Sequence, residues 1–147
     1  MNGSVVNGFR EKTYEEFYLG ETATFSKTIG EEDILLFAGL SGDVYPLHVD
    51  EEYAKTTRFG RRAAHGMLSA SLISTVCGLL LQRPGGLLIG QTIRYRRPVF
   101  VGDTLTATAE VAELMPDKRR VRCKTTILNQ HGDLVVDGEA TIQKDPA

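Results

Sequence analysis

The chain has 147 residues, a length that suits one domain with one hydrophobic core. Hydrophobic residues make up 41% of it and charged residues 24%, as is typical of soluble globular proteins. Its 17 basic and 19 acidic side chains give a formal net charge of -2, so charge gives no reason to expect nucleic acid or an anionic membrane as a partner. We expect residues 1–147 to form a single domain, with residues 1–16 as a leader that Tyr14, Phe17 and Tyr18 anchor.

The N-terminal residues and the cysteines bear on the compartment in which the protein works. Residues 1–8 lack the basic and apolar regions of a signal peptide, and the cytoplasm is therefore the expected location. Cys77 and Cys123 lie in apolar patterns and are expected to be buried thiols in a reducing compartment. The sequence has no CxxC pair or Cys/His cluster that would predict a metal site.

The first part of the chain predicts one strand and two helices. Residues 22–29 alternate and are rich in β-branched side chains, which favours a strand. Residues 31–40 predict a helix that carries three carboxylates in its first turn and is stopped by Gly39 and Gly42. Residues 51–56 predict one more short helix.

Residues 67–81 form the longest apolar run in the chain. The run is apolar nearly all round, which predicts a helix that is buried on most sides. A membrane span is the competing interpretation, but the run has only fifteen residues, five of them Ser, Thr or Gly, whereas a span needs about 20. The small residues would let other elements approach closely, which also fits pairing with a second copy of the chain.

The remainder of the chain predicts β-structure. Strand patterns cover residues 87–99, 104–111, 121–128 and 134–142, with polar turns at 115–118 and 131–133. A single helix that is apolar all round needs an element to wrap it, and one strongly curved antiparallel sheet can do so. The predicted fold class is therefore α+β, with a curved antiparallel sheet of about five strands wrapped round one long central helix.

The stretch from Ser41 to Asp50 is the candidate site. Asp43 and His48 lie five residues apart in a segment bounded by glycine and proline, so a local bend can aim both at one point. One is an anion at neutral pH and the other titrates near it, so together they can hold a water molecule and move a proton through it. The alternative is an Asx-turn, in which Asp43 caps the turn and His48 is an ordinary loop histidine.

Three motifs resemble the MaoC-like dehydratase family, the (R)-specific enoyl-CoA hydratases of the hot-dog fold. They are Phe37-Ala38-x-x-Ser41-Gly42-Asp43-x-x-Pro46-Leu47-His48-x-Asp50, Ala64-His65-Gly66-Met67-Leu68 and Arg96-Arg97-Pro98-Val99-x-x-Gly102-Asp103. Together they cover most of residues 20–143 in the expected order.

The resemblance assigns roles to individual residues. In that family the aspartate and the histidine of the first motif hold the catalytic water, which points to Asp43 and His48. The motif glycine, here Gly66, donates its backbone N–H to the thioester oxygen, and the start of a helix offers such a free N–H. Ser74 matches a family serine that supports the histidine. The implied reaction is the syn hydration of a trans-2-enoyl-CoA to an (R)-3-hydroxyacyl-CoA, in fatty-acid β-oxidation or polyester-precursor supply, without a metal or an organic cofactor.

Tyr45 departs from the family pattern, which usually has asparagine at this position. Asparagine suits the left-handed conformations of such a loop, and tyrosine tolerates them less well. We expect Tyr45 to change the shape of the acyl pocket, either by narrowing it or by binding a polar acyl group through its hydroxyl.

Several basic residues and one more histidine lie close to the predicted site in the sequence. Arg58, Arg61 and Arg62 are candidates to contact the phosphates of CoA, although a solvated loop would explain them almost as well. His65 belongs to the second motif, and we expect it to have a structural role near the helix start.

The resemblance leaves other functions open. One is a hydratase or dehydratase of another CoA thioester, such as a branched, dicarboxylic or aromatic-pathway intermediate. Others are a hot-dog acyl-CoA thioesterase and a non-catalytic acyl-CoA-binding module. The expected partners are an acyl-CoA substrate and a second copy of the chain, because two copies commonly join their sheets edge to edge in this family. Hexamers remain an alternative to the homodimer.

Overall fold

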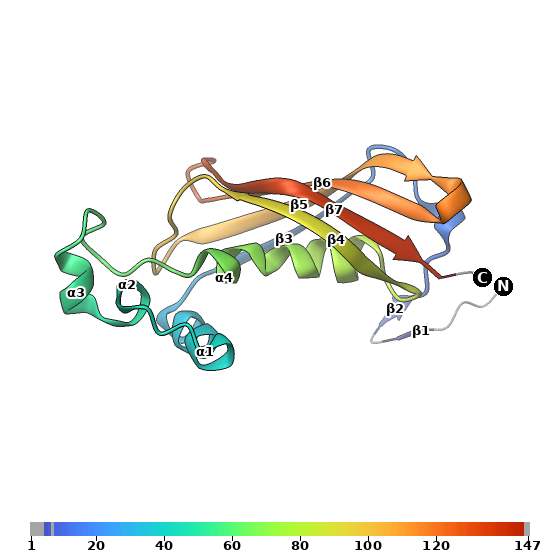
Figure 1. Ribbon diagram of the computed structural model, residues 1–147. Helices are drawn as coiled ribbons and strands as arrows, with labels where there is room; N and C mark the ends of the chain where they lie inside the picture. Colours follow the sequence, from blue (N-terminus) through green and yellow to red (C-terminus); the bar gives the residue numbers. More distant parts are fainter. Residues whose placement is uncertain (1–4, 7, 146–147) are drawn as a thin grey trace.

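The computed structural model describes residues 5–6 and 8–145, and it has one layer of sheet with helices on one side (Figure 1). The elements follow the order β1 (Val5–Val6), β2 (Phe9–Arg10), η1 (Tyr14–Glu16), β3 (Thr22–Thr28), α1 (Glu31–Ser41), α2 (Pro46–Val49), α3 (Glu51–Lys55), α4 (Gly66–Ala70), η2 (Ser74–Leu81), β4 (Gly86–Tyr95), β5 (Thr104–Met115), η3 (Pro116–Lys118), β6 (Arg120–Leu128) and β7 (Leu134–Lys144).

Five of the strands form one antiparallel sheet in the order β3-β5-β6-β7-β4. Its inward face is apolar because alternate residues of each strand point to the same side. On β5 these residues are Leu105, Ala107, Ala109 and Val111, all of which are buried. The alternation seen in the sequence therefore sets the core face, and the predicted α+β class with a five-stranded antiparallel sheet is confirmed.

The central helix runs along the inward face of this sheet from Gly66 to Leu81, as α4 and η2 (Figure 1). Its second half is wound more loosely than an α-helix, since the N–H of Gln82 donates to the carbonyl oxygen of Cys77, five residues back, at 3.1 Å. Ile73, Val76 and Cys77 are fully buried in the core. Among the described residues, no helix is long and apolar enough to cross a membrane.

The helix is buried on most sides, as its composition predicts, but one stripe of it is exposed. Met67 is 60% exposed and Leu79 is 40% exposed, and Ser71 and Ser74 are exposed as well. The physical reason is that the sheet covers one side of the helix only, so a stripe of mostly small residues on the other side faces solvent in the single chain.

Two strands differ in length from their sequence patterns by about four residues, more than the others do. The strand expected over residues 87–99 ends at Tyr95, because the N–H groups of Arg96 and Arg97 both turn to the carbonyl oxygen of Val135. The strand expected over residues 104–111 continues to Met115, across an irregularity in its pairing with β6 between Val111 and Glu113.

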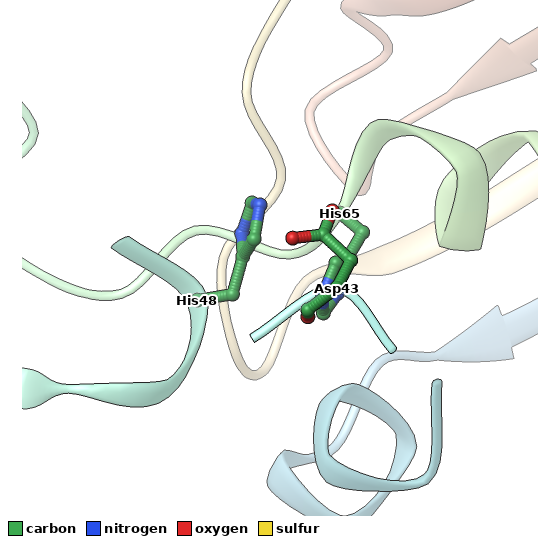
Figure 2. Close-up of side chains that lie close together, drawn as sticks. All are labelled: Asp43, His48 and His65. Carbon is green, nitrogen blue, oxygen red and sulfur yellow. The ribbon is translucent and has the colours of Figure 1, made fainter. Parts of the chain in front are cut away.

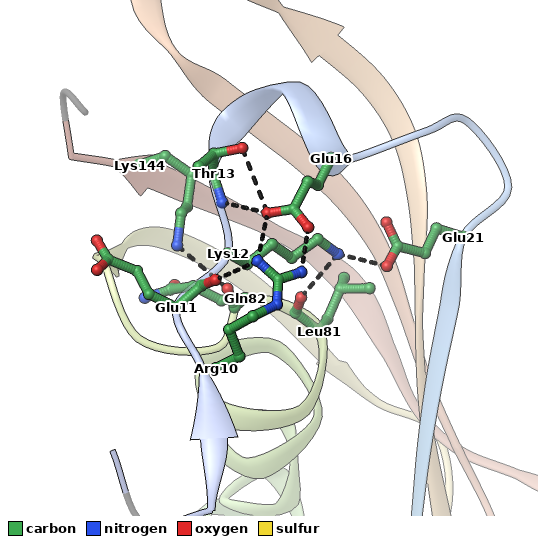
Figure 3. Close-up of polar contacts among 9 residues, drawn as sticks. All are labelled: Arg10, Glu11, Lys12, Thr13, Glu16, Glu21, Leu81, Gln82 and Lys144. Carbon is green, nitrogen blue, oxygen red and sulfur yellow. Dashed lines mark hydrogen bonds and ion pairs between the residues drawn. The ribbon is translucent and has the colours of Figure 1, made fainter. Parts of the chain in front are cut away.

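Two lysines cap the C-terminal end of the central helix (Figure 3). The last carbonyl groups of a helix have no partner within it. The ammonium of Lys12 bonds to the carbonyl oxygen of Leu81 at 3.2 Å and forms an ion pair with Glu21. Lys144 bonds to the carbonyl oxygens of Gln82 at 3.2 Å and Pro84 at 3.0 Å. Burial lowers the pKa of Lys144 to about 8.

The segment before the sheet packs through two of its three expected anchors. Tyr14 and Phe17 are buried in the core, whereas Tyr18 is 61% exposed, so the prediction for Tyr18 is wrong. Cys77 and Cys123 are free, buried thiols on the helix and on β6, and a hydrogen bond between them, followed by burial, raises the pKa of Cys77.

Candidate active site

A left-handed turn brings Asp43 out of the end of α1. Gly42 has φ 79°, a conformation that favours glycine, and its N–H closes the helix on the carbonyl oxygen of Ala38 at 2.9 Å. Ser41 then holds the next residue, since the N–H of Asp43 donates to the Ser41 hydroxyl at 3.1 Å. The chain therefore leaves the helix abruptly, and Asp43 lies exposed just beyond it.

Pro46 begins the short helix α2, which carries His48. The fixed φ of proline suits the first position of a helix, and the residue before it is pushed to extended backbone. Tyr45 accordingly has φ -55° and ψ 130°. The candidate stretch is thus partly helical, where the sequence predicted a loop. Tyr45 also avoids the left-handed region, so the conformational argument against tyrosine at this position is wrong.

The backbone of residue 63 fixes the orientation of the His48 ring. His48 Nδ1 lies 2.7 Å from the carbonyl oxygen of Ala63. A carbonyl oxygen only accepts, so Nδ1 carries a hydrogen and Nε2 is the nitrogen left to meet a water or a substrate. Ala63 is itself held by a β-bridge to Phe100, and the N–H of Ala64 donates to Val99 at 2.7 Å.

The structure brings Asp43, His48 and His65 together (Figure 2). One ligand atom from each side chain lies within 4.8 Å of the others. The rings of His48 and His65 are stacked with their centroids 3.9 Å apart. Asp43 Oδ1 also accepts the N–H of Tyr45 at 3.1 Å, which is the Asx-turn of the alternative interpretation. That bond leaves the other carboxylate oxygen open, so the turn and the pairing with His48 coexist.

Two cavities meet at His48, Gly66 and Tyr95, which line both of them. One, of about 330 Å³, runs along the apolar residues Phe59, Pro98, Val99 and Val136 and is bordered by Arg58, Arg96 and Arg97. The other, of about 440 Å³, contains Asp43 and His65 and is walled by Phe37 and Met67. The Asp43/His48 pair therefore faces a space that extends in two directions.

Gly66 is placed as a donor at this junction. It is the first residue of α4, and its N–H has no acceptor among the residues that the structure describes. A side chain would not fit here easily, because a Cβ on Gly66 would lie 2.9 Å from the ring of Tyr95. Tyr95 in turn donates its hydroxyl to the sulfur of Met67 at 3.1 Å.

The three arginines of the predicted CoA-binding cluster have different surroundings. Arg62 forms ion pairs with Glu31 and Glu51, and only 12% of its side chain is exposed, so its guanidinium is already engaged by carboxylates. The Arg61 guanidinium lies 4.0 Å from the ring centroid of Phe100 and lines a separate surface pocket. Arg58 does border the apolar cavity of about 330 Å³.

Ser74 and Tyr45 are not among the residues that line either cavity. Ser74 is exposed on η2, and eight residues of helix place it roughly 12 Å beyond Gly66. Tyr45 is 51% exposed and meets the edge of His48, with ring centroids 5.7 Å apart, and then Tyr53 at 6.2 Å. These contacts place Tyr45 beside the pair, on the flank of His48.

His65 is more central to the site than its sequence position indicates, and Phe37 and Tyr95 join it there without having been predicted as site residues. His65 is 2% exposed and touches both members of the pair, which sequence spacing does not reveal because 22 residues separate it from Asp43. The sequence feature that could have identified His65 as a site residue is its position directly before Gly66 in the second motif.

The hydrogen bonds of the three side chains leave few of their donor atoms free for a metal ion. His65 Nε2 bonds to the carbonyl oxygen of Asp43 at 2.8 Å and therefore carries a hydrogen, while Nδ1 is inaccessible to solvent. A ligand nitrogen must offer a free lone pair towards the ion. Only one carboxylate oxygen of Asp43 and Nε2 of His48 are left without a hydrogen-bond partner among the described residues.

Comparison with known proteins agrees with the fold and with the motifs. A family model described as MaoC like domain matches residues 15–132. The chain is 48% identical over 129 residues to an (R)-specific enoyl-CoA hydratase of Rhodospirillum rubrum, covering 88% of this chain and 89% of that protein. It is 41% identical over 130 residues to a 3-hydroxybutyryl-CoA dehydratase of Methylorubrum extorquens, covering 88% and 82%.

Solved structures give the same result. The unliganded R-hydratase PhaJ1 of Pseudomonas aeruginosa superposes with a TM-score of 0.86 at 47% identity, covering 92% of this chain and 86% of that one. The (R)-hydratase of Aeromonas caviae superposes with a TM-score of 0.85 at 42% identity, covering 90% and 99%. The predicted hot-dog fold is confirmed by these neighbours, and the chain belongs to the family of MaoC-like domains.

Proposed function

We propose that this protein is a hydro-lyase that adds water to a trans-2-enoyl-CoA to give an (R)-3-hydroxyacyl-CoA. The observation that carries the proposal is the convergence of Asp43 and His48 at the junction of two cavities, next to the free N–H of Gly66. This reaction requires two side chains that hold and deprotonate a water molecule, and a hydrogen-bond donor that stabilises the oxyanion. The relatives named as hydratase and dehydratase support the same reaction in its two directions.

The pair would hold one water between the open carboxylate oxygen of Asp43 and Nε2 of His48. Asp43 takes a proton from the water, whose oxygen forms a bond to C3 of the substrate. The electrons of the C2–C3 double bond move towards the thioester, giving an enolate, and the pair then delivers one proton to C2. One proton is taken and one is returned, so the pair ends each turnover in its starting state.

Gly66 would stabilise the intermediate. The negative charge of an enolate gathers on the thioester oxygen, and the N–H of Gly66, which has no acceptor within residues 5–6 and 8–145, is a suitable donor. One such donor contributes about 3 kcal/mol to a transition state. The missing side chain lets the thioester approach the backbone closely.

This mechanism calls for no metal and no organic cofactor. Prolonged dialysis against a chelator is therefore expected to leave kcat unchanged, and restoration of lost activity by a divalent ion would contradict the assignment.

We further propose a single domain, a cytoplasmic location that suits the two free thiols, and a homodimer. Cell fractionation tests the location.

The decisive experiment follows the conjugated enoyl absorbance of crotonyl-CoA and of a longer trans-2-enoyl-CoA, with the configuration of the product determined. Asp43→Asn keeps an acceptor for the N–H of Tyr45 but cannot take a proton. His48→Asn keeps an N–H near the Ala63 carbonyl but lacks Nε2. Each change is expected to lower kcat by roughly 10²- to 10⁴-fold without unfolding the protein.

Other outcomes would favour the alternative functions. Release of free CoA without loss of the enoyl group would indicate a thioesterase. Binding of acyl-CoA without turnover would indicate a binding module. Turnover confined to branched, dicarboxylic or aromatic thioesters would keep the chemistry and change the substrate.

A further inference from the structure

His65 is held between two aromatic rings directly before Gly66. Its ring centroid lies 3.9 Å from that of His48, with the rings stacked, and 4.8 Å from that of Phe37. Only 2% of the residue is exposed. One face of the His65 ring therefore supports the ring of His48, which stacks on it at an interplanar angle of 28°.

The edge of the same ring is bonded to the backbone of the other member of the pair. His65 Nε2 lies 2.8 Å from the carbonyl oxygen of Asp43, which can only accept, so the ring donates. Among the described residues, the other hydrogen bonds of residues 42–44 stay within residues 38–45. The bond from His65 is thus the hydrogen bond that ties this turn to the start of the central helix.

The second nitrogen of the ring has no comparable use. Nδ1 is buried and has no hydrogen-bond partner among the described residues. A buried polar atom without a partner destabilises a fold, so stability does not explain a histidine at this position. If the side chain were needed only for stacking, phenylalanine would serve without a buried, unpartnered nitrogen. If it were needed only as a hydrogen-bond donor, a non-aromatic residue would serve.

We propose that His65 is a positioning residue, which fixes the backbone of Asp43 through Nε2 and the plane of the His48 ring by stacking, and so sets the separation of the two groups that hold the water. This inference rests on the proposed hydration. His65 itself exchanges no proton with the substrate.

Three substitutions separate the two contacts. In His65→Gln the side-chain amide nitrogen takes the place of Nε2, and the ring is lost. In His65→Asn the amide reaches only as far as Nδ1, and both contacts are lost. In His65→Phe the ring remains and the donor is lost, together with the unpartnered Nδ1.

His65→Phe is expected to melt no lower than the unmodified protein, while its kcat falls roughly 100-fold, because small misplacements of reacting groups have effects of that size. KM is expected to stay within about threefold, since the groups that bind the substrate are unchanged. His65→Gln is expected to keep a kcat at least about tenfold above that of His65→Asn. A structural role alone would instead make kcat follow the melting temperature.

A readout without turnover keeps the inference separate from the proposed function. The N–H of Tyr45, which bonds to the Asp43 carboxylate, is expected to exchange with solvent at least about tenfold faster in His65→Phe and His65→Asn than in His65→Gln. If no enoyl-CoA is hydrated but this order of exchange is seen, the proposed function fails and the positioning role stands. An unchanged kcat in His65→Phe, or equal exchange and equal kcat in the glutamine and asparagine variants, would overturn the inference.

Discussion

Arg58 and Arg62 differ in what their guanidinium groups are free to contact. Arg62 is engaged by Glu31 and Glu51 and is largely covered. Arg58 lies over the ring of Phe59, 4.8 Å from its centroid, at the border of the apolar cavity next to His48. A guanidinium at the mouth of a cavity can bind a phosphate without taking part in the chemistry beyond it.

We therefore expect Arg58→Ala to raise KM for an acyl-CoA about tenfold and to leave kcat unchanged. This result is typical when the lost contact was equally strong in the bound substrate and in the transition state. Arg62→Ala is the matched control, and it is expected to lower stability without raising KM. Steady-state kinetics at low and high salt check this, because an exposed charge contact weakens as salt rises. A higher KM in Arg62→Ala alone would assign the phosphate contact to Arg62.

Lys144 provides a pH dependence. Burial lowers its pKa from 10.5 to about 8 in the folded chain. Between these two values the unfolded chain holds a proton that the folded chain has released, so the free energy of unfolding rises with pH. Burial of the charged ammonium thus lowers the free energy of unfolding by its full amount below pH 8. This loss disappears as the pH rises from 8 to 10.5.

Denaturant unfolding between pH 7 and 10.5 tests this effect. Relative to Lys144→Met, the unmodified chain is expected to gain on the order of 3 kcal/mol across the window. Met in place of the exposed Lys118 serves as the control, and it is expected to follow the unmodified chain. Parallel curves for the chain and for Lys144→Met would contradict the lowered pKa.

At the scale of elements, the segment from Arg10 to Glu21 contains two ion pairs in contrasting surroundings (Figure 3). Arg10 pairs with Glu16 and is 48% exposed, whereas Lys12 pairs with Glu21 with only 3% of its side chain exposed. Lys12 also bonds to the end of the central helix. Removing one partner of a buried pair leaves a charge without compensation, while an exposed pair contributes little.

Lys12→Met is expected to lower the free energy of unfolding by about 3 kcal/mol, whereas Arg10→Met leaves it nearly unchanged. The double change Lys12→Met with Glu21→Gln is expected to recover part of the loss, because it removes the isolated carboxylate. Chemical denaturation measures all three. Equal losses for Lys12→Met and Arg10→Met would show that the helix cap contributes nothing.

At the scale of the whole molecule, the two edges of the sheet differ in chemistry. On β3 the side chains of Thr24, Ser26 and Thr28 are bonded to hydroxyls of β5. On β4 the exposed residues include Leu87 at 57% and Ile89 at 43%. An exposed apolar edge strand favours pairing with another strand. The proposed homodimer is therefore expected to form along β4.

A lysine on this edge should prevent the pairing. Ile89→Lys is expected to shift the protein from dimer to monomer at micromolar concentration, as measured by light scattering or sedimentation equilibrium. Leu36→Lys, on the exposed face of α1, is the matched control and should leave the dimer intact. A monomeric unmodified chain, or dissociation by the α1 change alone, would contradict pairing through β4.

The sequence by itself determined the fold class, and it indicated Asp43 and His48 as the proposed catalytic pair. Alternation along β5, β6 and β7 indicated the inward face of the sheet, because side chains in a strand alternate between its two faces. Gly42 ends α1 just before Asp43, and Pro46 begins α2, which carries His48, both through local conformational preference alone. These signals come from residues that are close together in the sequence, and local sequence patterns predict such features.

Only the tertiary structure decided which distant residues surround that pair. Ion pairs with Glu31 and Glu51 engage Arg62, while Ser74 lies apart on the exposed stripe of the helix. His65 and Tyr95 come to the site from residues 22 and 52 positions beyond Asp43. Such contacts depend on how the start of the central helix packs against the end of β4. That packing depends on many side chains together and cannot be read from single residues of the sequence.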